Sequence, residues 1–288
     1  MTPADPSPGP GAPGAAPRDA RPRLVATDLD GTLLHSDGTV TPRTREVLQQ
    51  LDARGVPVVF TTGRPIRWME SLWEEVGGHG LAICSNGGIV YDVARRRVRT
   101  SRAIPGEVVR EVGRLLRAAI PGTTFAVEKT GGFGREPDFL PRLQVNHAPE
   151  VVVGPLEDMA DDTVVKLLAR HEGMDPEPFW RRVESVLGDR VVTTWSSVGT
   201  LVEISAAGVT KASTLAVLAA ELGFGPDDVV AFGDMPNDLP LLEWAGTAYA
   251  MANAHPTVRE LAAHEAPAND DDGVATVLAR LFDLPRAL

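Results

Sequence analysis

The sequence is poor in cysteine and contains no long apolar run, and each shortage excludes a class of protein. Cys84 is the only cysteine among 288 residues, so no disulfide can form within the chain and no cysteine-based zinc site can be built. No segment approaches the roughly 18 consecutive apolar residues of a membrane span, and the N-terminus lacks the apolar segment of a secretory signal. These absences predict a cytoplasmic protein with no membrane partner.

Positive charge is also scarce. Lys and Arg total 28 against 39 Asp and Glu, and the formal net charge is −11. A field of this sign disfavours nonspecific binding to nucleic acid, since it repels the phosphate backbone. A small anionic substrate is not excluded, because a pocket that holds a metal ion and a lysine attracts phosphate despite an acidic exterior.

The remaining composition is that of a folded protein with a tail. Hydrophobic residues make up 43% and charged residues 23%, close to the globular average, and the length favours two domains. Residues 1–22 consist mostly of Pro, Ala and Gly and offer little to bury. We expect this stretch to be a disordered tail.

The rest of the chain alternates between two kinds of pattern. In residues 23–88 and again in 208–288, short apolar runs alternate with amphipathic segments; this predicts a parallel sheet covered by helices on both faces. Thr41 followed by Pro42 predicts the first turn of one such helix. Residues 89–207 instead contain a predicted β-hairpin, helices and a glycine-rich loop. The fold class is therefore α/β, with a Rossmann-like core and an inserted α+β domain.

Two carboxylates follow the first predicted strand, within Asp28-Leu29-Asp30-Gly31. Ligands bind at the carboxyl ends of strands in open α/β sheets. Residues two apart in an extended segment share a face, so Asp28 and Asp30 are expected to converge. Taken alone, such a string is equally typical of a polar turn.

Two further strand ends and one helix start add polar groups. Thr62, Gly63 and Arg64 follow the second strand, where a hydroxyl and backbone donors could hold an oxyanion. A later strand runs into the segment 233–238, which carries two more carboxylates, and Lys211 opens a helix. Crowded carboxylates repel one another unless a cation neutralises them, and hard oxygen ligands select Mg²⁺. A magnesium site is the expectation.

The ordered set DLDGT, TTGR, GVTKAS and GDMPND resembles the four motifs of the haloacid dehalogenase superfamily. Each motif is short, but their order and their places at strand and helix ends are specific. The resemblance spans residues 23–93 and 200–284 and is strongest to the Cof-type branch, whose members carry an α+β cap between the second and third motifs. It implies a haloacid dehalogenase core at 23–88 and 208–288 with a cap at 89–207.

The resemblance also implies a mechanism, that of a phosphatase with an aspartyl-phosphate intermediate. Asp28 would be the nucleophile, and Asp30 would be the general acid and then the general base. Thr62 and Lys211 would hold the phosphoryl oxygens. The residues implied as ligands of Mg²⁺ are Asp28, Asp30 through its backbone carbonyl, Asp234 and Asp238. Thr32 matches the D-x-D-x-T form that is typical of phosphatases in this family.

Substrate contacts are less defined by the sequence. The positions expected to face a small phosphorylated metabolite, by family similarity a sugar phosphate, are Gly63, Arg64, Asn86, Gly87 and Asn237. A turn-stabilising role for Asn86 and a helix-capping role for Asn237 are alternatives. Two other functions stay open: a phosphotransferase or phosphomutase that uses the same aspartyl-phosphate, and a noncatalytic protein that binds a phosphometabolite.

Overall fold

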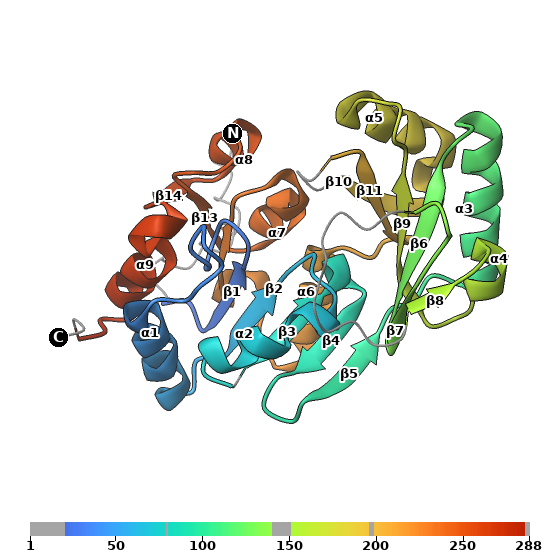
Figure 1. The fold of residues 1–288 in the computed structure, drawn as a ribbon. Coiled ribbons are helices and arrows are strands. Elements are labelled where there is room, and N and C mark those ends of the chain that lie inside the picture. Colours follow the sequence, from blue (N-terminus) through green and yellow to red (C-terminus); the bar gives the residue numbers. More distant parts are fainter. Residues whose placement is uncertain (1–20, 79, 140–150, 196–198, 286–288) are drawn as a thin grey trace, which may run out of the picture.

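The computed structural model describes residues 21–285 except 79, 140–150 and 196–198. The tail predicted for residues 1–22 therefore lies almost wholly outside the described residues. Two β-sheets organise the chain, an eight-stranded sheet in a large unit (residues 21–101 and 207–285) and a six-stranded sheet in a small unit (residues 102–206) (Figure 1). None of the helices described has both the length and the apolar character needed to cross a lipid bilayer.

The large unit confirms the predicted α/β class with a parallel-sheet core. Its strand order is β14-β13-β12-β1-β2-β3-β4-β5, in which the first six strands are parallel and β4 and β5 form an antiparallel hairpin at the edge. Its strands are β1 (Leu24–Asp28), β2 (Val58–Thr61), β3 (Leu81–Cys84), β4 (Ile89–Asp92), β5 (Arg97–Ser101), β12 (Val229–Gly233), β13 (Thr247–Met251) and β14 (His264–Ala266).

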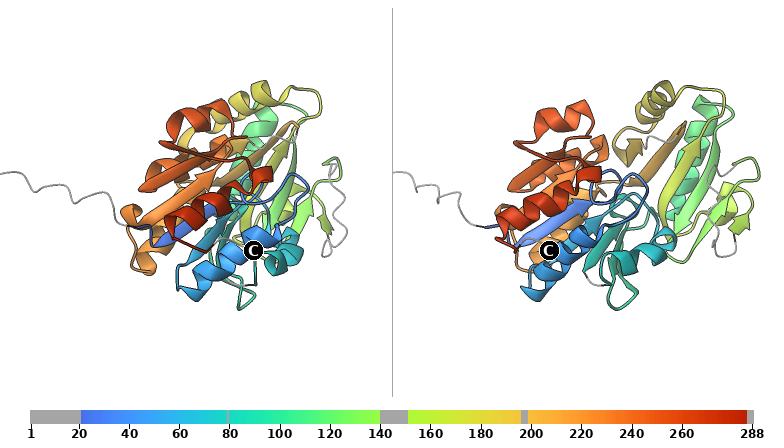
Figure 2. Two further views of the ribbon diagram at one scale, coloured as in Figure 1. Left: turned by 90° about the vertical axis from the view of Figure 1, so that its left-hand side faces the viewer. Right: turned by 60° about the vertical axis from the view of Figure 1, so that its left-hand side comes forward.

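Helices cover both faces of this sheet, as buried apolar strands require. Helix α1 packs against α9, and α6 packs against α7 (Figures 1 and 2). The helices and 3-10 turns of the large unit are α1 (Pro42–Ala53), η1 (Ile66–Trp68), α2 (Glu70–Glu75), η2 (Ser85–Gly87), α6 (Lys211–Glu221), η4 (Pro226–Asp228), η5 (Pro236–Asp238), α7 (Leu239–Trp244), α8 (Pro256–Leu261), η6 (Asn269–Asp271) and α9 (Gly273–Leu281). The predicted start of α1 is confirmed, because Thr41 Oγ1 accepts a hydrogen bond from the Thr44 N–H.

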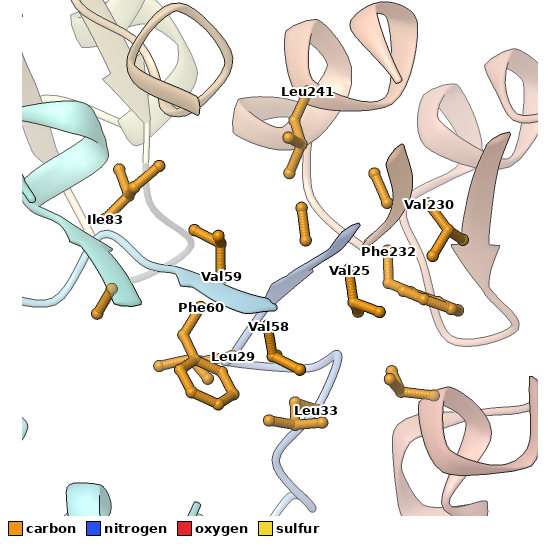
Figure 3. Packing of buried hydrophobic residues seen from close by; sticks show 14 of the residues in the cluster. Val25, Leu29, Leu33, Val58, Val59, Phe60, Ile83, Val230, Phe232 and Leu241 are labelled. Carbon is orange, nitrogen blue, oxygen red and sulfur yellow. The ribbon is translucent and has the colours of Figure 1, made fainter. Parts of the chain in front are cut away.

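Alternation along each strand sends side chains into both helical layers. Figure 3 shows Val58 and Phe60 on one face of β2 and Val59 on the other, with Leu241 of α7 on the side of Val59. All four side chains are almost completely buried. The central strands are thus fixed from both sides, which gives their carboxyl ends a rigid base.

The small unit is an antiparallel sheet with helices on one face. Its strand order is β10-β11-β9-β6-β7-β8, antiparallel except for the β7–β8 pair. Helices α3 and α5 pack together over this sheet, with α3 on the side away from the large unit (Figure 1). Its elements are α3 (Gly106–Ala119), β6 (Thr124–Lys129), β7 (Gly132–Arg135), β8 (Val151–Val153), α4 (Leu156–Met159), β9 (Val164–Arg170), α5 (Pro176–Leu187), η3 (Gly188–Arg190), β10 (Val191–Trp195) and β11 (Leu201–Ala206).

The hairpin β4–β5 lies elsewhere than the sequence pattern suggested. It was expected to open the inserted domain at residue 89, but β4 pairs with β3 and extends the eight-stranded sheet. The cause is that apolar Ile89, Val90 and Tyr91 pair with β3 in a register that buries their side chains in the core of the large unit. The chain enters the small unit only after Ser101.

Candidate active site

Three neighbouring parallel strands end at one edge of the eight-stranded sheet. Strands β12, β1 and β2 are adjacent, and Asp28 at the end of β1 lies beside Thr61 at the end of β2. Thr62 continues β2, and Asp234 follows the end of β12. The carboxyl ends of these strands therefore bring polar groups together from segments about 200 residues apart in the chain.

Lys211 supplies the positive charge of this site. It is the first residue of α6, and Thr210 caps that helix by accepting the Ser213 N–H at 3.0 Å. The Lys211 Nζ is buried and donates to Asp28 Oδ1 at 2.5 Å and to Asp238 Oδ1 at 2.7 Å. Burial works against the charged form, but the two carboxylates prevail and raise the pKa of Lys211 above its usual value. The ammonium form is thereby held in place.

Three buried carboxylates face this single ammonium. Asp28, Asp234 and Asp238 each offer one oxygen, and these oxygens lie within 4.8 Å of one another. Burial raises the pKa of Asp28 well above its usual value, an effect that Lys211 opposes and the other two carboxylates reinforce. Burial and Asp238 raise the pKa of Asp234 to about 7, against a hydrogen bond from Thr32 Oγ1 at 2.9 Å. Negative charge is in excess, and a set of hard oxygen donors suits Mg²⁺.

Asp30 lies apart from these carboxylates. Strand β1 ends at Asp28 and a turn begins at Leu29, so the two aspartates do not belong to one extended segment. The Asp30 side chain is 53% exposed and forms a two-point ion pair with Arg64, in which Arg64 Nε donates to Asp30 Oδ2 at 2.9 Å. Asp30 is not part of the buried cluster, and its convergence with Asp28 on one substrate atom stays a prediction.

Thr62 is buried and fixed through its backbone and its hydroxyl. Its N–H donates to the Ile83 carbonyl at 2.9 Å, and its carbonyl accepts from the Asn86 N–H at 3.1 Å. The Arg64 N–H donates to Thr62 Oγ1 at 3.0 Å. A hydroxyl that accepts one hydrogen bond still has its own proton to donate. Thr62 can therefore donate to an oxyanion beside Asp28.

Asn86 and Gly87 form a tight turn against the start of α6. Asn86 has φ of +56°, a conformation that asparagine tolerates better than most residues. Gly87 has φ of +108°, and a Cβ at this position would overlap the carbonyl of Thr210, the residue before Lys211. Gly87 thus permits close packing of two backbones, whereas its expected contact with substrate remains a prediction.

A cavity of about 150 Å³ lies beside this cluster, between the two units. Its lining combines residues expected from sequence with residues of the small unit's edge strand: Asn86, Val192, Thr193, Thr194, Val209, Thr210, Lys211, Pro236, Asn237 and Pro240. Threonine hydroxyls and asparagine amides line it together with apolar valine and proline side chains. The threonines of β10 were not identified from the sequence as candidate site residues. The available signal was a pair of polar residues within a strand-like run.

We predict that Gly31 is needed to leave room for a side chain of the site, and not only for the backbone conformation of its loop. Its Cβ would overlap Asp234 Oδ2, whereas a Cβ at Gly38, which has a similar φ of +83°, would meet nothing within 4 Å. Gly38→Ala should therefore lower the free energy of unfolding only by the cost of a left-handed backbone conformation, about 1–2 kcal/mol. Gly31→Ala should lower it by more and should also displace Asp234. Urea denaturation of both variants measures the difference; equal losses would contradict the close approach.

Comparison with known proteins places the chain among phosphatases. A family model for haloacid dehalogenase-like hydrolases matches residues 25–278. A phosphoglycolate phosphatase of Methanopyrus kandleri is 32% identical over 260 residues, covering 90% of this chain and 97% of that protein. A 5-amino-6-(5-phospho-D-ribitylamino)uracil phosphatase of Bacillus subtilis is 28% identical over 273 residues, covering 92% and 100%. The crystal structure of a haloacid dehalogenase-like hydrolase from Bacteroides thetaiotaomicron, 25% identical, superimposes with a TM-score of 0.73 and covers 91% of this chain and 100% of that one.

Proposed function

Because the chain belongs to the haloacid dehalogenase-like hydrolases and is a phosphomonoester hydrolase, we propose that it hydrolyses a small phosphorylated metabolite through an aspartyl-phosphate on Asp28. The observation that carries this proposal is the buried contact of Lys211 Nζ with Asp28 Oδ1 at 2.5 Å. The contact fixes a carboxylate at a strand end, and the Lys211 ammonium favours its ionised form against the larger, opposing effect of burial on the pKa of Asp28. The ionised carboxylate is the nucleophile that phosphoryl transfer through an acyl phosphate needs.

The proposed reaction has two displacements at phosphorus. An oxygen of Asp28 attacks phosphorus in line with the ester oxygen, so that a P–O bond to Asp28 forms while the bond to the leaving alkoxide breaks. Water then attacks the same phosphorus, which releases inorganic phosphate and restores the Asp28 carboxylate. Thr62 and Lys211 donate to the phosphoryl oxygens, where negative charge is concentrated.

We assign the proton transfers to Asp30. It would give its proton to the leaving alkoxide and then take one from the attacking water. Its ion pair with Arg64 bears on this role, since both Asp30 oxygens are engaged by Arg64. The pair must therefore open when substrate binds, and Arg64 then becomes free to contact the substrate.

Mg²⁺ is the proposed cofactor. Its ligands would be the carboxylates of Asp28, Asp234 and Asp238 and the backbone carbonyl of Asp30. The fit rests on three buried carboxylates close together, where burial and then the neighbouring carboxylates raise the pKa of Asp28 and of Asp234. When bound, the ion neutralises charge on the phosphate and helps to orient it.

The proposed substrate class is a sugar phosphate. Three side chains in the lining of the 150 Å³ cavity support it, since Asn86, Thr194 and Asn237 offer amides and a hydroxyl to a hydroxylated leaving group. The name of the relative from Bacillus subtilis also specifies a 5-phospho-D-ribityl group. The small volume excludes bulky leaving groups unless the two units separate.

Phosphate release from an aryl phosphate, and from a panel of sugar phosphates, tests the proposal. We expect release with Mg²⁺, little release with a chelator, and recovery when Mg²⁺ is restored. Phosphate that appears on an added sugar acceptor instead of in solution would indicate a transferase. Absence of release from every ester, with Mg²⁺ bound, would reject the hydrolase mechanism.

Binding of Mg²⁺ should depend on pH because the ligands must lose their protons. The pKa of Asp234 is raised to about 7 and that of Asp28 is also raised, so protons compete with the ion below neutrality. Affinity should rise from pH 6 to pH 8, by about tenfold per pH unit below 7 for each proton displaced. Calorimetric titration measures it. Asp234→Asn should flatten the pH dependence, and an unchanged slope in that variant would contradict the assignment.

A further inference from the structure

A row of polar side chains crosses the face of the six-stranded sheet that is turned toward the large unit. Glu128 and Lys166 are cross-strand partners in β6 and β9, and Thr194 and Glu203 are partners in β10 and β11. Val127, Leu167, Val202 and Ile204, which adjoin these residues in sequence, lie in the apolar core under α3 and α5. Glu128, Lys166 and Glu203 are at most 9% exposed. Charged residues in the middle of apolar strands need a reason for their burial.

All four residues of this row make hydrogen bonds to the large unit, and the partner of Glu128 there is Arg67. Lys166 Nζ donates to Glu203 Oε1 at 2.6 Å and to the carbonyl of Gly63 at 2.7 Å. Asn86 Nδ2 donates to Glu203 Oε2 at 2.7 Å and to Thr194 Oγ1 at 3.1 Å. A continuous chain of hydrogen bonds therefore runs from Gly63 through the small unit and back to Asn86.

The two groups of the large unit held in this way lie on either side of Thr62. Gly63 is the next residue in the chain, and the Asn86 N–H donates to the Thr62 carbonyl at 3.1 Å. Gly63 also packs closely against Asn86, since a Cβ on it would lie 3.1 Å from Asn86 Oδ1. Thr62 is thus enclosed in a ring of contacts that the Lys166–Glu203 pair completes.

Stability alone does not explain this pair. A buried ion pair loses solvation on both partners, and an apolar pair of similar volume is often as stable. An apolar pair could not donate to the Gly63 carbonyl or accept from the Asn86 amide. Lysine is also rare here: the chain has three lysines, and the two that are most buried are Lys166 and Lys211, both at this site.

We propose that Lys166 and Glu203 are positioning residues for the phosphatase reaction. They hold the Gly63 carbonyl and the Asn86 side chain, and through them the Thr62 hydroxyl, in the arrangement that receives the phosphoryl group. The phosphate site is therefore complete only when the small unit is docked on the large one. The inference rests on the proposed function for its effect on turnover, whereas the loop positioning itself is independent of it.

The test uses a double variant that removes both charges, Lys166→Met/Glu203→Gln, so that no lone buried charge remains. The matched control is Arg117→Met/Glu136→Gln, which removes another ion pair of the small unit that contacts no part of the large one among the hydrogen bonds and ion pairs of the described residues. Lys166→Arg tests rescue, because arginine can still donate to both acceptors. Thermal unfolding confirms that each variant is folded.

Turnover of an aryl phosphate is the first readout. Loss of Thr62 positioning should lower kcat by about 10²-fold, the size of effect that a misplacement near 1 Å produces. KM should change by less than about threefold, because binding of the aryl group does not involve the pair. The control should keep wild-type kcat, and Lys166→Arg should recover part of it. A double variant with wild-type kcat would overturn the proposal.

Hydrogen exchange is the second readout and does not depend on activity. The N–H groups of Thr62, Arg64 and Asn86 are hydrogen-bonded in the ring, so peptides that span residues 60–66 and 84–88 should exchange faster in the double variant only. If wild-type protein lacks turnover but these peptides respond, the proposed function fails and the positioning role stands. If exchange is unchanged while KM alone shifts with the substrate, the pair binds substrate and the positioning role is wrong.

Discussion

Asp28→Asn is expected to lower phosphate release from any substrate by about 10⁴-fold or more, which is the size of effect of removing a nucleophile. Asparagine keeps the shape of the side chain but cannot form the acyl phosphate. Asp28 contacts Lys211 at 2.5 Å. It lies at the end of β1 and is the only carboxylate of the cluster that lies within a strand. Steady-state release with Mg²⁺ measures the loss.

A measurement of stability distinguishes loss of the reaction from loss of the fold in this variant. Burial and two neighbouring carboxylates raise the pKa of Asp28, which means that its ionised form is unfavourable in the folded protein. A neutral amide removes that repulsion, so the midpoint of thermal unfolding should stay equal or rise. Asp175→Asn, an exposed carboxylate at the start of α5, is the matched control and should retain full activity. Retention of a tenth of the activity by Asp28→Asn would exclude it as the nucleophile.

Lys211→Met should produce the largest loss of stability together with a loss of activity. Methionine removes the ammonium that Asp28 and Asp238 share and leaves both carboxylates buried. Breaking a buried ion pair on one side costs about 3–5 kcal/mol. Activity should fall by about 10²–10³-fold, since a donor to the phosphoryl group is lost as well.

The stability loss in Lys211→Met should depend on pH with a definite sign. Without the ammonium, the pKa of Asp28 rises further in the folded state, above its value in the unfolded chain. The folded variant then binds more protons than the unfolded one, so its stability increases as pH falls through the raised pKa. Wild-type protein keeps the ammonium, and the difference between the two should therefore shrink from pH 8 to pH 5.

Urea denaturation at pH 5 and pH 8, without Mg²⁺, measures this difference. Lys129→Met is the control, because Lys129 forms an ion pair with Asp161 at 2.6 Å that is partly exposed; such pairs contribute about 0–1 kcal/mol. A Lys211→Met variant that loses as much at pH 5 as at pH 8 would show that packing of the side chain, and not charge, dominates.

The sequence by itself determined the central parallel strands of the large sheet and the chemistry at their ends. Apolar runs such as LVATD and VVAFG are buried along their whole length, and each is followed by polar residues. Parallel strands place their carboxyl ends at one edge, so the meeting of Asp28 with Asp234 followed from local patterns, whereas the place of Lys211 was implied by the family resemblance. Thr41 and Pro42 likewise determined the start of α1.

Only the tertiary structure decided the direction of side chains beyond the strand ends and the contacts between the units. Asp30 lies two residues after Asp28, yet the strand ends between them and the Asp30 carboxylate pairs with Arg64. Lys166 and Glu203 are single charges within apolar strands, and nothing local shows that they meet Gly63 and Asn86. Periodicity specifies which face of a strand a residue occupies, whereas its partner depends on register and docking, which arise from contacts distant in the chain.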